Sequence, residues 1–160
     1  MSRDEARDLV ETGERIKSAV VAQYPVVHPE NPGINAVTFT QFAGPVSAMG
    51  DGTKTGQNAV VVSPGKIDRS PCGTGTSARL AVLAARGEFE ISETYVSRSL
   101  IGSEFQAQIV STITVGTLPA IVPSIAGRAW ITGHHQYTLD PTDPFPQGYT
   151  LSDTWYCALD

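Results

Sequence analysis

Apolar residues near the amino terminus recur every three or four positions, and acidic residues are frequent among the first of them. This is the spacing of an amphipathic helix with acidic residues in its first turn. The pattern predicts one helix from about Arg3 to Gln23 with one buried face. The apolar positions that define this face are Ala6, Leu9, Val10, Ile16, Ala19 and Val20.

The next segment, YPVVHPENPGIN, contains three prolines and a glycine, and it is therefore predicted to be a connector. Beyond it, five segments are rich in β-branched and aromatic residues and mostly bounded by Gly, Pro or Asp, which is typical of strands. We expect at least these five strands: INAVTFTQF, NAVVVS, FEISETYVS, EFQAQIVSTITV and AWITGHHQYTL.

Short polar segments complete the pattern. Asp51-Gly52 and Lys54-Thr55-Gly56 are interpreted as a turn between two strands. The tail DPTDPFPQGYTLSDTW is too rich in proline for a regular element.

One further segment, Thr76 to Arg86, contains the apolar run LAVLAA, and Gly87 is placed to end a helix there. Because this helix lacks a polar face in its middle, we expect it to be covered on most sides. The predicted fold class is therefore α+β, with strands wrapped around a central helix. No internal repeat or second domain is indicated.

Composition limits the function classes. The chain has 160 residues, which suits one domain, and 41% of them are hydrophobic. The net charge of −5 offers no basic surface for nucleic acid or anionic membranes. Two cysteines are too few for a disulfide scaffold, and the charged amino terminus differs from a signal peptide. We expect a cytoplasmic protein that binds neither nucleic acid nor membrane.

The segment DRSPCGTGT, residues 68–76, is the strongest candidate for chemistry. Cys72 precedes Gly73 and Gly75 at the expected entrance of the central helix, where glycines allow a ligand to approach the backbone closely. A helix N-terminus has unpaired N–H donors and partial positive charge, so it suits an anion and lowers the pKa of a thiol. Together with Asp68, which could meet an ammonium group, these groups predict a pocket for an amino acid with a reactive thiolate beside its α-carbon.

Other interpretations of these residues are weaker. The string GTGTSA matches a dinucleotide fingerprint, but the VVVS segment ends about ten residues before the first glycine instead of leading directly into it. A phosphate-binding loop would need a lysine that the motif lacks. A buried structural cysteine is the remaining alternative, and the flanking Pro, Gly and Asp favour a functional thiol over it.

No cofactor is expected. His134 and His135 would point to opposite faces of a strand, which is poor geometry for one metal ion. Pyridoxal phosphate would need a Schiff-base lysine, and none of the lysines lies in a supporting motif.

The segment from Asp68 to Ala78, DRSPCGTGTSA, closely resembles the signature around the second active-site cysteine of the proline racemase family, which includes the 4-hydroxyproline epimerases. The resemblance extends through VVHPENPGINAVTFTQF, SRSLIGSEFQAQI and GRAWITGHHQYTLDPTDPFPQGY. It implies a diaminopimelate-epimerase-like half-domain, with residues 1–160 as the C-terminal half, 1–23 as a linker helix and 34–160 as the α+β part.

The resemblance also implies a mechanism. Enzymes of this family use two cysteines on opposite faces of the substrate α-carbon as base and acid, without a cofactor. Cys72 would be one of them, Asp68 would hold the ring nitrogen, and the amides of Gly73 and Thr74 would bind the carboxylate of proline or 4-hydroxyproline. Related 3-hydroxyproline dehydratases carry threonine where Cys72 stands, so the cysteine favours racemase or epimerase chemistry.

The other cysteine motif of the family, Met-Cys-Gly-His, is missing from this chain. Its second cysteine, Cys157, lacks the following Gly and His and is interpreted as an incidental thiol. Three hypotheses follow: a fragment that needs a complementary N-terminal half, a homodimer in which two copies of Cys72 face one cleft, or a non-catalytic binding module.

Overall fold

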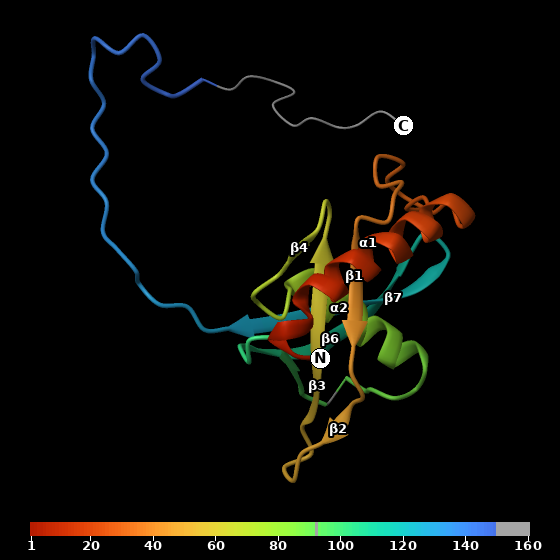
Figure 1. The fold of residues 1–160 in the computed structure, drawn as a ribbon. Helices are drawn as coiled ribbons and strands as arrows, with labels where there is room; N and C mark the ends of the chain where they lie inside the picture. Colours follow the sequence, from red (N-terminus) through yellow and green to blue (C-terminus); the bar gives the residue numbers. More distant parts are fainter. Residues whose placement is uncertain (92, 150–160) are drawn as a thin grey trace. The chain divides into compact units, whose positions relative to one another are not determined.

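A computed structural model describes residues 1–91 and 93–149 of the chain. The chain divides into two units, Met1–Arg128 and Ala129–Asp160. All helices and strands of the described residues lie in the first unit (Figure 1). None of the described helices is long and apolar enough to cross a membrane.

The first unit combines two α-helices with a mixed β-sheet. A short 3₁₀ turn (Arg3–Glu5) leads into α1 (Ala6–Gln23), and α2 is Gly73–Ala85. The strands are β1 (Phe39–Ala43), β2 (Ser47–Ala48), β3 (Lys54–Val62), β4 (Lys66–Ile67), β5 (Tyr95–Arg98), β6 (Glu104–Val115) and β7 (Leu118–Gly127).

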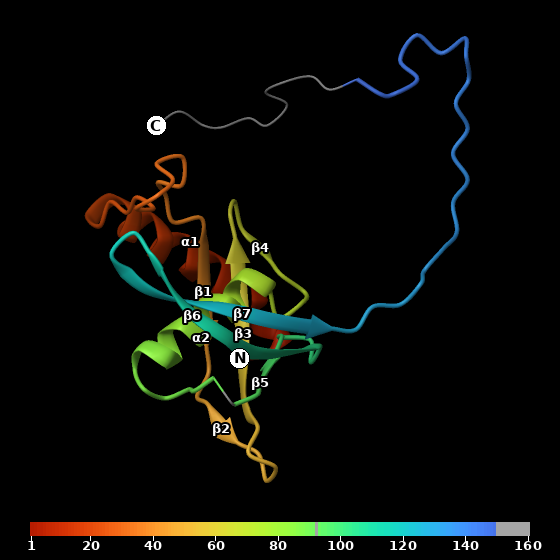
Figure 2. The same ribbon diagram turned by 180° about the vertical axis from the view of Figure 1, so that it is seen from behind.

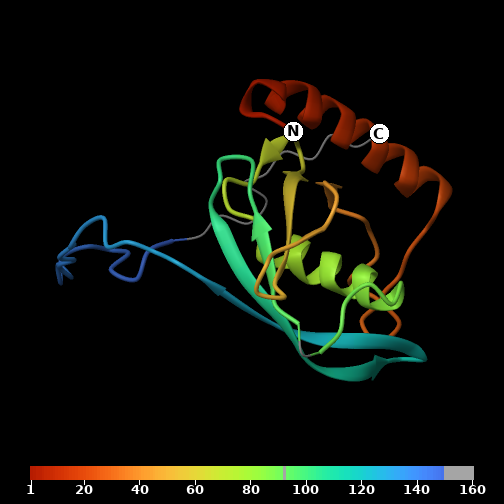
Figure 3. The ribbon, with the colours of Figure 1, turned by 90° about the horizontal axis from the view of Figure 1, so that it is seen from below.

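The sheet has the strand order β1-β3-β5-β6-β7, and β2 and β4 add to β3. Strands β3 and β5 are parallel, whereas the other pairs are antiparallel. Parallel strands need a crossover connection, and α2 lies in the crossover from β3 to β5. The register of β6 against β7 shifts between Ile109 and Ser111, and such a bulge bends a strand. Figures 2 and 3 show β6 and β7 curving past α2, and both strands contact it. The predicted α+β class with strands around a central helix is confirmed.

The core forms where α2 meets the sheet. Leu80 and Leu83 of α2 are 0% exposed, and they cluster with apolar side chains of β5, β6 and the connection after α2. Burial of such side chains stabilises the fold by about 1.5–3 kcal/mol each. These partners are Phe89, Tyr95, Ala107 and Ile109.

Helix α1 packs against β1 and β3 on the other side of the sheet from α2, as Figure 3 shows. Gly13 allows this approach, because a Cβ at Gly13 would lie 3.0 Å from Cγ2 of Val61. The carbonyl of Gly13 also accepts a hydrogen bond of 2.9 Å from the hydroxyl of Thr40.

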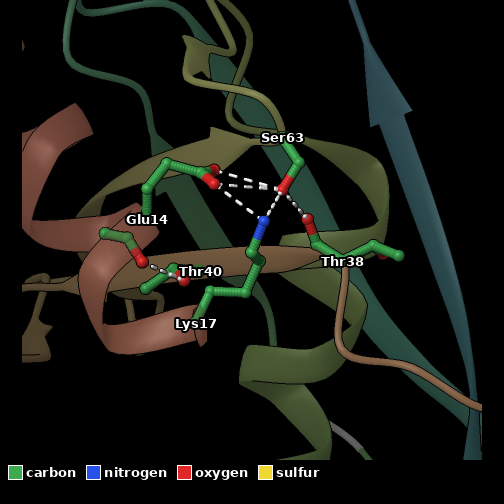
Figure 4. A network of polar contacts seen from close by, with 6 residues as sticks. Glu14, Lys17, Thr38, Thr40 and Ser63 are labelled. Carbon is green, nitrogen blue, oxygen red and sulfur yellow. Dashed lines mark hydrogen bonds and ion pairs between the residues drawn. The ribbon is translucent and has the colours of Figure 1, made fainter. Parts of the chain in front are cut away.

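A polar network fixes the same helix (Figure 4). The ammonium group of Lys17 donates to Oε2 of Glu14 at 2.7 Å and also to the hydroxyl of Ser63. That hydroxyl donates to the carbonyl of Thr38 at 3.2 Å. Because the side chains of Glu14, Lys17 and Ser63 are only partly exposed, their contacts help to orient α1 on the sheet.

Both predicted helices and several predicted strands are confirmed. The first helix ends at Gln23 as expected, and Gly87 follows α2 with a φ of +69°. Strand β6 covers the predicted segment 104–115. The central helix begins at Gly73, three residues earlier than expected, because the glycines of the motif form its first turn.

Strand β7 was not predicted. It contains Pro119 and Pro123, which argue against a central strand because proline has no N–H to donate. β7 tolerates both prolines because it is an edge strand, paired only with β6. The turn interpretation holds for Asp51-Gly52 but was wrong for Lys54-Thr55-Gly56, which begin β3.

The strand predicted over AWITGHHQYTL is wrong. Residues 129–139 form no strand, and every described residue from 129 to 149 is exposed. An extended segment becomes a strand only when another strand pairs with its backbone, and sequence periodicity does not report whether that partner is present.

Candidate active site

The candidate site is the loop between β4 and the start of α2, residues 68–72. The N–H of Asp68 donates to the carbonyl of Val60 at 2.9 Å, and the hydroxyl of Ser103 donates to the carbonyl of Arg69 at 3.1 Å. The loop is therefore attached to the central strand β3 on one side and to the β5–β6 connection on the other.

Ser70 links the two residues of this loop that the sequence predicted to be functional. Oδ1 of Asp68 accepts hydrogen bonds from the N–H and from the hydroxyl of Ser70, both at 2.9 Å. Oγ of Ser70 accepts the N–H of Cys72 at 3.0 Å. Sequence reasoning missed Ser70, although Asp followed two residues later by Ser is a turn-forming combination that could have indicated it.

Cys72 has an unusual backbone conformation. Its φ is 63° and its ψ is 120°, and no other non-glycine residue among those described has a positive φ. Such conformations cost about 1–3 kcal/mol and persist only where the surrounding contacts enforce them. The residue is the N-cap of α2, and only 6% of its surface is exposed.

The thiol lies against the first turn of α2. Sγ of Cys72 accepts the N–H of Gly75 at 3.4 Å. Burial raises the pKa of the Cys72 thiol, the amides of Gly75 and Thr74 lower it, and the carboxylate of Asp68 raises it. The net pKa lies above the ordinary value. The amides at the helix start lower the pKa as expected, but desolvation of the thiolate and the neighbouring carboxylate outweigh them, so the predicted net lowering is wrong.

The glycines of the motif differ in their surroundings. A Cβ at Gly73 would meet no atom within 4 Å, so its backbone faces open space. A Cβ at Gly75 would lie 2.8 Å from Cγ2 of Val60 and 3.5 Å from Cδ of Gln41. Gly73 can thus admit a ligand to the backbone, whereas Gly75 is required for packing of α2 on the sheet.

Gln41 is a second polar residue that the sequence did not single out. Its Nε2 atom is buried without a hydrogen-bond partner among the described residues. Because it faces α2 from β1, its position depends on strand pairing, which the sequence alone does not fix.

A hollow of about 470 Å³ lies elsewhere, against β1, β3 and β5. Neither Asp68 nor Cys72 lines it, so the candidate site rests on the loop and the helix N-terminus. The residues of the hollow include Phe42, Gly44, Pro45, Gln57 and Arg98.

The other candidates add no site. His134 and His135 are both exposed, and no group of three or more metal-ligating side chains occurs in residues 1–91 and 93–149. Cys157 lies outside the described residues.

A family model described as proline racemase matches residues 1–150. The chain therefore belongs to the proline racemase family, which confirms the resemblance seen in the sequence.

Two solved structures are similar. A "probable proline racemase" from Agrobacterium radiobacter K84, with bound carbonate, has 40% identity and a TM-score of 0.72. A hydroxyproline epimerase from Agrobacterium vitis, with bound trans-4-OH-L-proline, has 39% identity and a TM-score of 0.73. The match covers 96% of this chain in both cases, but only 44% and 43% of those proteins. The chain thus spans less than half the length of either.

Proposed function

We propose that the chain is one half of a cofactor-independent racemase or epimerase that inverts the α-carbon of proline or 4-hydroxyproline, with Cys72 as its acid/base group. The observation that supports this most is the placement of Cys72, which is held in a strained conformation at a helix N-terminus beside a carboxylate. Strained residues concentrate at functional sites.

In this proposal each group of the loop has one task. Sγ of Cys72 exchanges a proton with the α-carbon on one face of the substrate. The carboxylate of Asp68 pairs with the ring nitrogen, and the amides of Gly73 and Thr74 bind the carboxylate, where negative charge develops as the proton leaves. The open space at Gly73 supports an approach to these amides.

Substrate binding would also change the acidity of the thiol. In the free chain the pKa of Cys72 is raised, first by burial and also by Asp68, so the protonated thiol is the major form at neutral pH. A cationic ring nitrogen against Asp68 would offset the negative charge and favour the thiolate. The same residue would thus bind the substrate and help to activate the base.

The proposal includes a partner, because inversion requires a second group on the opposite face of the α-carbon. Both similar structures belong to chains more than twice as long, which favours a complementary half as the source of that group. A second copy of this chain is the alternative, with Cys72 of each copy at one shared cleft.

One similar structure is a probable proline racemase and the other a hydroxyproline epimerase with bound trans-4-OH-L-proline, so both imino acids are kept as substrates of the proposal. A second candidate function is a binding module that retains the loop without turnover, which the absence of the Met-Cys-Gly-His motif favours. Dehydration of 3-hydroxyproline is disfavoured because Cys72 stands where those relatives carry threonine.

Proton NMR in deuterated buffer tests the proposal. We expect the α-proton of trans-4-hydroxy-L-proline to exchange slowly with solvent in the presence of the chain. The exchange rate of L-proline is measured under the same conditions, and the two rates are compared. Cys72→Ser should abolish the exchange, whereas Cys157→Ser is the control and should leave it unchanged. Binding of either imino acid without exchange would contradict the proposal and identify a binding module.

A further inference from the structure

We propose that Ser70 is a positioning residue whose hydroxyl couples the carboxylate of Asp68 to the backbone of Cys72. This inference rests on the proposed function, because it assigns Ser70 the task of holding the substrate-binding carboxylate and the thiol in one fixed geometry.

The first step is the connectivity of the hydroxyl. It donates to Oδ1 of Asp68 at 2.9 Å and accepts the N–H of Cys72 at 3.0 Å. A hydroxyl can do both at once, whereas a methyl group can do neither. One side chain therefore ties both functional residues together.

The second step concerns the strained backbone. Cys72 keeps a positive φ only because contacts around it enforce that conformation. Its N–H donates to Oγ of Ser70, its carbonyl accepts the N–H of Thr76 at 2.9 Å, and its Sγ accepts the N–H of Gly75. Ser70 is the only one of the three partners that contributes a side-chain atom, because Thr76 and Gly75 contribute backbone N–H groups. A point substitution of Ser70 can therefore remove its contact without altering the helix.

The third step links position to acidity. Asp68 is the charged group that acts on the Cys72 thiol, and its negative charge raises the pKa of that thiol. This influence falls with distance, so it depends on the orientation of the carboxylate. Without the hydroxyl of Ser70, Oδ1 of Asp68 keeps only the backbone contact, and the carboxylate can turn away from the thiol.

A double-mutant cycle measures this coupling. In a Cys157→Ser chain, which leaves Cys72 as the single thiol, its pKa is obtained from the pH dependence of alkylation by iodoacetamide. Asp68→Asn, which keeps the acceptor atom, should lower this pKa and raise the thiolate population at a fixed pH by at least about threefold. In a Ser70→Ala background the same substitution should have less than half of that effect on the pKa. Equal shifts of the pKa in both backgrounds would overturn the proposal.

Two controls separate this role from loosening of the loop. Ser103→Ala removes the bond to the carbonyl of Arg69 but not the bridge, and it should leave the effect of Asp68→Asn at full size. Ser70→Thr keeps the hydroxyl and should preserve the coupling, whereas Ser70→Val, of the same shape, should lose it. A reduced effect in Ser103→Ala, or equal behaviour of Thr and Val, would count against the bridge.

The measurement needs no turnover. A chain that exchanges no substrate proton but shows the coupling would contradict the proposed function and leave the role of Ser70 in positioning the two groups intact. A chain that exchanges the substrate proton but shows no coupling would support the proposed function and overturn the role of Ser70.

Discussion

At the scale of single residues, the conformation of Cys72 is the feature that most separates this loop from an ordinary helix start. An N-cap residue usually has extended dihedral angles, whereas Cys72 has a positive φ at a position that carries a Cβ. The chain therefore maintains an unfavourable backbone to place one thiol beside the first turn of α2.

This strain leads to a stability prediction. Cys72→Gly should be more stable than Cys72→Ala by about 1 kcal/mol, because both variants lack the thiol but only alanine has a Cβ in the strained conformation. Urea unfolding of both variants measures the difference. An alanine variant of equal or greater stability would show that the conformation carries no strain.

A pH dependence follows from the thiol. Burial and Asp68 raise its pKa in the folded chain, so as the pH rises the unfolded chain loses this proton first. The protonated thiol therefore contributes its full share of the unfolding free energy below the ordinary thiol pKa of the unfolded chain. This contribution is lost as the pH rises through the higher pKa of the folded chain. We expect the parent chain to lose more stability than Cys72→Ser between neutral and alkaline pH in urea titrations. Parallel curves would contradict the raised pKa.

The sequence predicts this site only in part. The motif makes Asp68, Cys72, Gly73 and Thr74 the candidates, because its Pro and Gly spacing marks the entrance of a helix. The acidity of the thiol was predicted with the wrong sign, because it depends on how far burial outweighs the amides, and burial is a property of the folded chain.

At the scale of elements, two glycines decide how closely the helices approach the sheet. Gly13 brings α1 against Val61, and Gly75 brings α2 against Val60. Val60 and Val61 are neighbours in β3, so opposite faces of one strand carry the two helices. Apolar periodicity predicted α1, and the apolar run before Gly87 predicted α2, but the crossing points depend on contacts between residues distant in the sequence.

Gly75→Ala tests the packing of α2. The new Cβ would lie 2.8 Å from Val60, so the substitution should destabilise the chain by about 1–3 kcal/mol despite the better helix propensity of alanine. Gly73→Ala is the matched control, because its Cβ would meet open space, and it should be neutral or stabilising. Thermal unfolding of the two variants compares them, and equal stabilities would show that α2 has room to shift.

At the scale of the whole molecule, the described part of the second unit contains no buried side chain. Trp130 is 74% exposed and Tyr137 is 90% exposed, although the β-branched and aromatic residues of this segment predicted a strand there. Each substitution to alanine should therefore change the unfolding free energy by less than about 0.5 kcal/mol. Leu80→Ala, in the core of the first unit, should cost about 2–5 kcal/mol. A large loss from Trp130→Ala would mean that this segment packs on a partner in solution.

The stereochemistry of exchange tests whether the proposed activity needs a second acid/base group. A single thiol reaches one face of the α-carbon, so it can remove a proton and return a deuteron only to that face. We therefore expect the isolated chain to label trans-4-hydroxy-L-proline with deuterium while retaining its configuration, as measured by NMR together with chiral chromatography. An inverted product whose rate of formation rises with the square of the chain concentration would instead indicate a homodimer with Cys72 of both copies at one site. Retention at every concentration would leave the second thiol to a complementary half, as the length of the two similar proteins suggests.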